Sequence, residues 1–148
     1  MPNQIRCGPS GGAGGYDFQD DWSSAGRKIS KIVIRHGDYI DALQIHWADG
    51  KVSKMNGGSG GEETTITLQE DEYLVGIQGR YGTVVHSIVF HTTRRSVGPY
   101  GGDGGHATYS YNVGPQWPAL EVVAFFGRAG AYIDAIGCVF SERTLSPS

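Results

Sequence analysis

The chain has 148 residues, of which 24 are glycine, whereas the average usage of roughly 7% would supply about ten. This content disfavours a helical bundle, because glycine inside a helix costs about 1 kcal/mol relative to alanine. The 39% of hydrophobic residues and a formal net charge of −3 argue against disorder. Twelve basic against fifteen acidic side chains leave no excess of positive charge for nucleic acid, and no apolar stretch approaches the length of a membrane-spanning helix. We therefore expect one turn-rich domain over residues 1–148, with neither nucleic-acid binding nor membrane insertion.

Residues 1–8 lack the apolar core of a signal peptide, which predicts a cytoplasmic protein or one secreted by a non-classical route. Cys7 and Cys138 are the only cysteines, and they belong to neither a Cys-x-x-Cys pair nor a zinc-ligand set. They are either two apolar thiols or a disulfide that joins the two ends of the domain. The histidines form no metal-binding or nucleophile-partner motif, so we predict no metal, no cofactor and no catalysis.

Strand patterns follow one another along the chain, and no segment has a helical pattern. The predicted strands cover residues 29–35, 40–47, 64–68, 73–78, 84–93, 120–126 and 132–141. Asp49-Gly50 predicts a hairpin turn after the second of these strands. Residues 79–82 predict the turn of a hairpin between the fourth and the fifth.

Two elements recur in step along the chain. The pattern Gly-Gly-x-Gly-Gly occurs at Gly11–Gly15, Gly57–Gly61 and Gly101–Gly105, with starts 46 and 44 residues apart. A second element follows each cluster and covers Arg35–Leu43, Arg80–Ile88 and Arg128–Ile136. The chain is therefore predicted to contain three copies of a unit of about 46 residues, each with about four strands. We expect an all-β fold of three four-stranded antiparallel sheets around a pseudo-threefold axis.

The turn Gly-x-Tyr-x-Asp at Gly37–Asp41 and Gly130–Asp134 combines groups that suit a sugar. The aspartate can accept hydrogen bonds from two adjacent hydroxyls, backbone N–H groups can donate, and the tyrosine offers an apolar face for a ring. Glycine in the clusters can expose further N–H groups, because no Cβ blocks a ligand. An equally good interpretation is structural, in which each aspartate caps its own turn and each tyrosine packs locally.

In combination, these clusters and turns, together with Gly98-Pro99-Tyr100-Gly101-Gly102, resemble the jacalin-related lectins over residues 8–140. The resemblance implies the β-prism I fold and carbohydrate binding without catalysis. It also implies pockets that join each turn to the glycine cluster of the next unit. A glycosidase would need two nearby carboxyl groups, whereas Asp41 and Asp134 lie in separate repeats.

The resemblance assigns residues to three sites. The first site takes Gly15, Gly130, Ala131, Tyr132, Ile133 and Asp134. The second site takes Gly61, Gly37, Asp38, Tyr39, Ile40 and Asp41. The third site takes Gly105, Val84 and His86, and we expect it to be weak or empty, because a neutral histidine accepts one hydrogen bond where a carboxylate accepts several. Proximity alone suggests that Asp38 and Arg128 touch the outer sugars of an oligosaccharide.

Galactose-preferring members of that family resemble a processed form with a free amino terminus at the first glycine cluster. Ten residues precede Gly11 here, so the chain is more similar to the mannose- and glucose-binding branch. The expected partners are mannose- or glucose-containing oligosaccharides and glycoproteins, and the resemblance also allows homo-oligomers. The alternatives are a galactose-type lectin and a non-catalytic scaffold that does not use its pockets.

Other residues are interpreted structurally. We expect the tryptophans at 22, 47 and 117 in the core, Arg94-Arg95 on a solvated edge strand, and the acids at 20–21 and 70–72 in turns.

Overall fold

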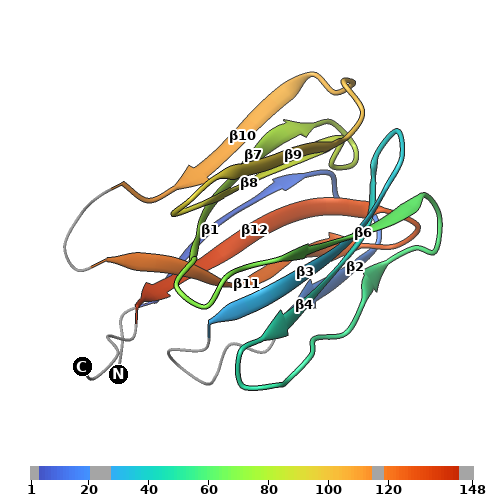
Figure 1. Ribbon diagram of the computed structural model, residues 1–148. Helices are drawn as coiled ribbons and strands as arrows, with labels where there is room; N and C mark the ends of the chain where they lie inside the picture. Colours follow the sequence, from blue (N-terminus) through green and yellow to red (C-terminus); the bar gives the residue numbers. More distant parts are fainter. Residues whose placement is uncertain (1–3, 21–27, 115–118, 144–148) are drawn as a thin grey trace.

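The computed structural model describes residues 4–20, 28–114 and 119–143, and these residues form twelve β-strands and no helix (Figure 1). The strands are β1 (Gln4–Gly11), β2 (Tyr16–Gln19), β3 (Ile29–His36), β4 (Ile40–Trp47), β5 (Asn56–Gly57), β6 (Glu62–Thr67), β7 (Leu74–Tyr81), β8 (Ser87–Thr92), β9 (Ser96–Gly101), β10 (Ala107–Asn112), β11 (Leu120–Ala129) and β12 (Ile133–Glu142). Within these described ranges, no helix is long and apolar enough to cross a membrane.

The strands form three antiparallel sheets of four strands each, which confirms the predicted architecture. The first sheet has the order β1-β12-β11-β2, the second β5-β4-β3-β6, and the third β10-β7-β8-β9. In each sheet a tight turn joins the two central strands and a glycine cluster joins the two edge strands. Figure 1 shows these turns and clusters gathered at the right-hand end of a three-sided prism.

The interior holds a large apolar cluster to which all three sheets contribute, and a second, smaller cluster lies in the first sheet. Ile34, Ile77 and Ile136, one from each sheet, are fully buried in the large cluster. Burial of such side chains stabilises the fold by roughly 1.5–3 kcal/mol each. The indole Nε1 of Trp47 donates to the carbonyl of Val123 at 2.8 Å and so ties the second sheet to the first. Trp47 is a core residue as predicted, while the other two tryptophans lie outside the described residues.

The third sheet differs from the expected hairpin. The first strand, β7, continues through Gly79 to Tyr81, so the turn covers residues 82–86 rather than 79–82. Gly79 lies inside the strand because it packs against the carbonyl of Ser87, where a Cβ would collide. Glycine here allows close packing of two strands instead of a turn. The hairpin at Asp49-Gly50 is present, with the Gly50 N–H bonded to the Trp47 carbonyl at 3.0 Å.

The two cysteines lie side by side on adjacent strands of the first sheet. Cys7 on β1 is the register partner of Cys138 on β12, and both are free thiols. Burial raises the pKa of each thiol, so the reactive thiolate is disfavoured at both positions.

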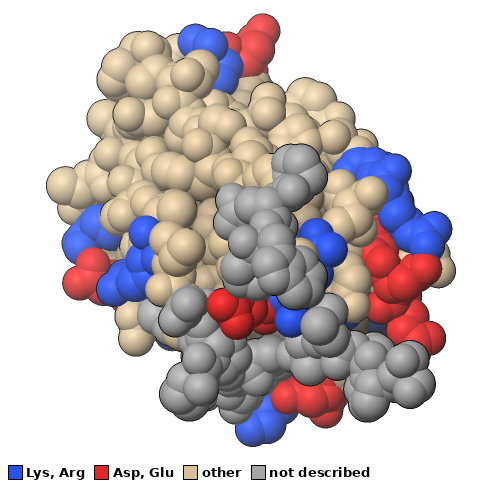
Figure 2. Space-filling view, turned by 90° about the vertical axis from the view of Figure 1, so that its left-hand side faces the viewer, with Lys and Arg blue, Asp and Glu red and all other residues tan. Residues whose placement is uncertain are grey.

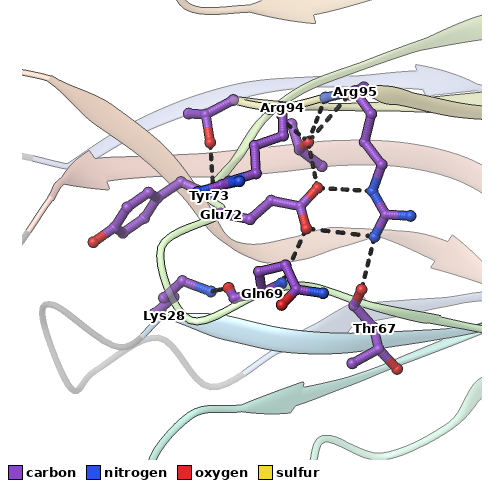
Figure 3. Close-up of polar contacts among 9 residues, drawn as sticks. Lys28, Thr67, Gln69, Glu72, Tyr73, Arg94 and Arg95 are labelled. Carbon is purple, nitrogen blue, oxygen red and sulfur yellow. Dashed lines mark hydrogen bonds and ion pairs between the residues drawn. The ribbon is translucent and has the colours of Figure 1, made fainter.

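The end of the prism away from the turns carries mixed charges. Figure 2 views this end and shows basic groups beside acidic groups at the top and at both sides, with uncharged side chains between them. Residues 70–72 form the predicted turn, with the Glu72 N–H bonded to the Gln69 carbonyl at 3.0 Å, but the Glu72 side chain is only 1% exposed. Its carboxylate accepts from the Arg95 guanidinium at 2.8 Å and from the Thr92 hydroxyl at 2.6 Å (Figure 3). These donors, Arg95 first, lower the pKa of Glu72 to about 2.

Arg95 is exposed as predicted, but it lies just before the edge strand β9 and not within it. It occupies the connection between β8 and β9, and its guanidinium also donates to the Thr67 carbonyl at 2.7 Å (Figure 3). Thr67 belongs to the second sheet, so Arg95 connects that sheet to the third. The neighbouring Arg94 forms an ion pair with Asp71 whose two side chains are largely exposed.

Two further buried carboxyl groups belong to the first sheet. Glu121 on β11 is 1% exposed, and its Oε1 has no hydrogen-bond partner among the described residues. Burial raises the pKa of Glu121 to about 8, opposed by Lys28 and Arg143. Asp20 is also buried rather than in a solvated turn, and its carboxylate accepts from the Phe125 N–H at 2.9 Å. Burial raises the pKa of Asp20 to about 7.

Candidate functional site

Each glycine cluster lies against the turn that the sequence pairs with it. One backbone hydrogen bond of 2.9 Å connects cluster and turn in all three cases: Gly12 N–H to Asp134 O, Gly58 N–H to Asp41 O, and Gly102 N–H to His86 O. Each turn also closes on itself in the same way: Gly37 N–H to Tyr39 O, Gly82 N–H to Val84 O, and Gly130 N–H to Tyr132 O, at 2.9–3.0 Å. The same backbone hydrogen bonds between turn and cluster therefore occur in all three repeats.

The first site brings the Asp134 carboxylate against the last two glycines of its cluster. A Cβ placed on Gly14 would lie 2.8 Å from Oδ2, and one on Gly15 would lie 2.8 Å from Oδ1. Gly15 also has a φ of +72°, which favours glycine. The Asp134 carboxylate therefore lies directly beside the backbone of Gly14 and Gly15, where neither residue has a side chain to separate them.

The second site repeats this geometry with Asp41 and its own cluster. A Cβ on Gly60 would lie 2.9 Å from Oδ2 of Asp41, and one on Gly61 would lie 2.7 Å from Oδ1. Gly61 has a φ of +73°. A cavity of about 160 Å³ lies here, lined by Gly37, Asp38, Tyr39, Asp41, Gly61 and Tyr132. The structure thus brings together most of the residues predicted for this site.

Two predicted site residues do not face the cavity. The side chains of Ile40 and Ile133 are fully buried in the core. The N–H of Ile40 donates to Val85 O at 3.0 Å, and the carbonyl of Ile133 accepts from Val85 N–H at 2.8 Å. These bonds join the three turns to one another near the pseudo-threefold axis. The two isoleucines therefore anchor the turns, because their position next to the axis places them inside the protein.

Tyr132 lies between two sites. Its turn belongs to the first site, yet its ring lines the cavity of the second. The ring packs edge-on against Tyr39, with centroids 5.0 Å apart, and Tyr39 in turn packs edge-on against His86 of the third site at 4.9 Å. The remaining site residue of that turn, Ala131, places its carbonyl against Gly58 of the second cluster. Each turn therefore contacts the cluster of a neighbouring site as well as its own.

The carboxylates of the two sites are held in similar surroundings. Partial burial raises the pKa of Asp41, and the charges of Arg35 and His36 oppose this rise. Partial burial also raises the pKa of Asp134, opposed by Arg128. Desolvation makes such a carboxylate a stronger acceptor for hydroxyl groups than one in open water.

The third site keeps the backbone frame but has different side chains. His86 takes the place of the aspartate, and its Nδ1 would lie 2.8 Å from a Cβ on Gly104. One additional residue, His106, follows the cluster before the paired strand begins, and Gly105 has a φ of +94°. Val84 replaces the tyrosine of the turn. This site has no carboxylate directed at the cluster.

Sequence reasoning missed the role of three arginines. Arg128 does not extend toward an outer sugar, because its guanidinium donates to the carbonyls of Gly14 and Gly15 and to Asp17. Arg35 and Arg80 bind the second and third clusters in the same way. The signal was present in the sequence, since each turn begins with Arg-x-Gly.

A larger groove lies outside the three sites. It has a volume of about 450 Å³ and runs along β2 and the 47–56 connection, with Tyr16, Lys54 and Asp20 among its lining residues. It lacks the combination of carboxylate and bare glycine backbone. Within the described residues, no group of three or more histidine, cysteine or acidic side chains could hold a metal ion.

A family model described as a jacalin-like lectin domain matches residues 7–139. The chain belongs to the jacalin-like lectin family. This is a family of non-catalytic carbohydrate-binding proteins, and its β-prism I fold is the three-sheet architecture described above.

Related proteins support this assignment. The chain is 34% identical to the jacalin-related lectin Calsepa of Calystegia sepium, covering 93% of this chain and 95% of that one. It is also 34% identical to a mannose/glucose-specific lectin of Parkia platycephala, covering 93% of this chain. The solved structure of a mannose-binding jacalin-related lectin from Ananas comosus has a TM-score of 0.81 and 34% identity, covering 93% of this chain and 96% of that one. Several relatives are longer, and the chain spans only 22% to 47% of their length.

Proposed function

We propose that this lectin binds terminal mannose or glucose residues of glycans through its first and second sites. The observation that carries the proposal is the duplicated arrangement of an aspartate against a bare glycine backbone, the half-buried Asp134 with Gly15 and the buried Asp41 with Gly61. A pyranose with two adjacent or nearby hydroxyls can donate both to one carboxylate and accept from the backbone N–H groups. The third site, with His86, stays weak or empty.

The preference for mannose-type sugars is supported by relatives rather than by the pocket alone. The lectins of Parkia platycephala and Parkia pendula are named mannose/glucose-specific, and the relative from Ananas comosus is named mannose-binding. Glycoproteins with such sugars are the partners that we propose. The cavity at the second site is only about 160 Å³, so a single sugar should bind weakly there. Two sites on one rigid frame would gain affinity for multivalent glycans by avidity.

Isothermal titration with methyl α-mannoside and methyl α-galactoside tests this proposal. We expect heat with the mannoside, a stoichiometry of two, and little heat with the galactoside. Binding of the galactoside in preference would favour the galactose-type alternative. No heat with either sugar at millimolar concentration would favour a scaffold that does not use its pockets.

A further inference from the structure

An arginine braces each glycine cluster from outside the site. In the first site, Arg128 donates from Nε to the carbonyl of Gly14 at 2.8 Å and from Nη2 to the carbonyl of Gly15 at 2.7 Å. In the second, Arg35 donates from the same two nitrogens to Gly60 and Gly61, at 2.9 Å each. The two planar guanidinium groups thus bind consecutive carbonyls with a fork of parallel donors, an arrangement that lysine cannot reproduce.

This fork determines where the adjacent N–H group points. The carbonyl of Gly14 and the N–H of Gly15 belong to one trans peptide unit, which is planar, so they point in opposite directions. By holding the Gly14 carbonyl on its own side, Arg128 keeps the Gly15 N–H turned away from the guanidinium. The same relation connects Arg35, the Gly60 carbonyl and the Gly61 N–H.

Glycine clusters need such support because their backbone is the most flexible in the chain. An unbraced cluster would have to lose its conformational freedom when a sugar binds, and that loss weakens binding. A cluster that is held by the arginine has already lost this conformational freedom when the protein folds. The brace therefore affects affinity through the cluster and needs no contact with the ligand.

Acidic side chains orient the guanidinium in the two sites that have an aspartate. Nη1 of Arg128 pairs with Asp17 at 2.6 Å, and Nη1 of Arg35 pairs with Glu63 at 3.4 Å. Each acid is the register partner of its arginine on the neighbouring strand. In the third sheet, the register partner of Arg80 is Thr108. The arrangement of acid, arginine, cluster and aspartate is thus complete only in the first and second sites.

We propose that Arg128 and Arg35 are positioning residues for sugar binding, each holding the last peptide unit of its cluster so that the N–H faces the sugar. This inference rests on the proposed function. It assigns to each arginine an effect on its own site alone. A merely structural role would instead lower the stability of the whole fold and weaken both sites together.

The test uses variants with a single remaining site. In an Asp41→Asn background, which leaves the first site, Arg128→Ala should weaken binding of methyl α-mannoside about tenfold, the equivalent of one hydrogen bond. Arg128→Lys should not restore it. In an Asp134→Asn background, which leaves the second site, Arg128→Ala should leave the affinity unchanged. Arg80→Ala removes the same two carbonyl bonds from the third cluster and is the matched control, with both affinities unchanged.

Two further readouts separate positioning from folding. The melting temperature should change little in Arg128→Ala, because Asp17, its partner in the ion pair, is largely exposed. The order parameter of the Gly15 amide should fall in the same variant without sugar present. Equal affinity of Arg128→Ala and its parent overturns the inference alone. Loss at both sites overturns it too, in favour of a structural role. Absence of binding by both single-site parents overturns the proposed function, and the inference with it.

Discussion

The ring of Tyr132 packs edge-on against the ring of Tyr39, with 5.0 Å between the centroids, although the two tyrosines belong to turns of different sheets. Tyr132 thereby lines the second site, where Asp41 supplies the carboxylate. The contact between cluster and turn places Thr83, next to Val84, against Gly12 of the first site. The residue of that turn which corresponds to Tyr132 is Val84, so the aromatic ring is specific to the second site.

Tyr132→Ala should therefore weaken mannoside binding at the second site by about two- to tenfold, the range expected for an aromatic contact. Titration of the variant in the Asp134→Asn background measures this site alone. Tyr132→Phe keeps the ring and should keep the affinity. If the loss appeared instead in the Asp41→Asn background, the ring would serve the first site, as the turn's position in the sequence suggests.

Asp134→Asn and Asp41→Asn should each remove one of the two sites. The amide keeps the shape of the side chain but replaces one acceptor oxygen by an NH2 donor and carries no charge. The hydrogen bond from one sugar hydroxyl is therefore lost, at about 1.5–3 kcal/mol for a bond to a charged group, and the bond from the other is weakened. Titration should give a stoichiometry of one for each variant and no binding for the double variant. His86→Ala is the control at the third site and should keep a stoichiometry of two. Wild-type affinity in the double variant would show that the pockets are wrongly assigned.

The pairing of clusters with turns could be predicted because both halves of each site carry a recognisable motif. Gly15 with Asp134 and Gly61 with Asp41 follow from the repeats and the family resemblance. The position of Tyr132 could not be predicted in this way. It depends on how three turns from three sheets pack against one another at the axis. The spacing of motifs along the chain does not predict these contacts between turns.

Burial of Glu72 escaped sequence reasoning for a similar reason. A run of three acids at 70–72 has the pattern of a turn, and the burial of Glu72 depends on Arg95 and Thr92 at the far end of β8, which donate to its carboxylate. Arg95→Ala should destabilise the protein at pH 7 by about 2–3 kcal/mol, since it leaves a buried carboxylate without its ion-pair partner. Chemical denaturation measures this loss. Arg94→Ala removes the neighbouring exposed ion pair with Asp71 and should cost less than about 0.5 kcal/mol.

The pH dependence gives the Arg95 prediction a second check. The pKa of Glu72 is about 2 in the folded protein and 4.5 as its ordinary value, so the stability it contributes is present above pH 4.5 and lost as the pH falls toward 2. In Arg95→Ala, the loss of stability between pH 4.5 and pH 2 should be smaller than in the wild type. A variant that kept the full wild-type slope between pH 4.5 and 2 would show that Arg95 does not stabilise the Glu72 carboxylate.

Glu121 should make the stability of the protein depend on pH in the direction opposite to that of Glu72. Its pKa is about 8 in the folded protein and 4.5 ordinarily, so the folded state holds a proton that the unfolded state releases. The free energy of unfolding should therefore fall as the pH rises from 4.5 to 8. Asp20, with a pKa of about 7, adds to this fall.

Glu121→Gln should stabilise the protein at pH 8 by about 2–4 kcal/mol relative to wild type and change it less at pH 5, because glutamine needs no proton to stay neutral. Urea unfolding at the two pH values measures the difference. Glu62→Gln, on an exposed part of β6, is the control and should keep the wild-type slope. A Glu121→Gln slope equal to that of wild type would contradict the assignment.

The closure of the first sheet by both ends of the chain makes the two sugar sites unequal during folding. Gly61 and Asp41 are 20 residues apart in the chain, whereas Gly15 and Asp134 are 119 residues apart. Joining distant segments requires a larger loss of chain entropy and slows their pairing. The contact between Gly61 and Asp41 of the second site can form once residues 41–61 have been made, while that between Gly15 and Asp134 of the first needs nearly the whole chain. A chain that ends before β11 would therefore complete neither site, because it lacks Asp134 of the first and Tyr132 of the second.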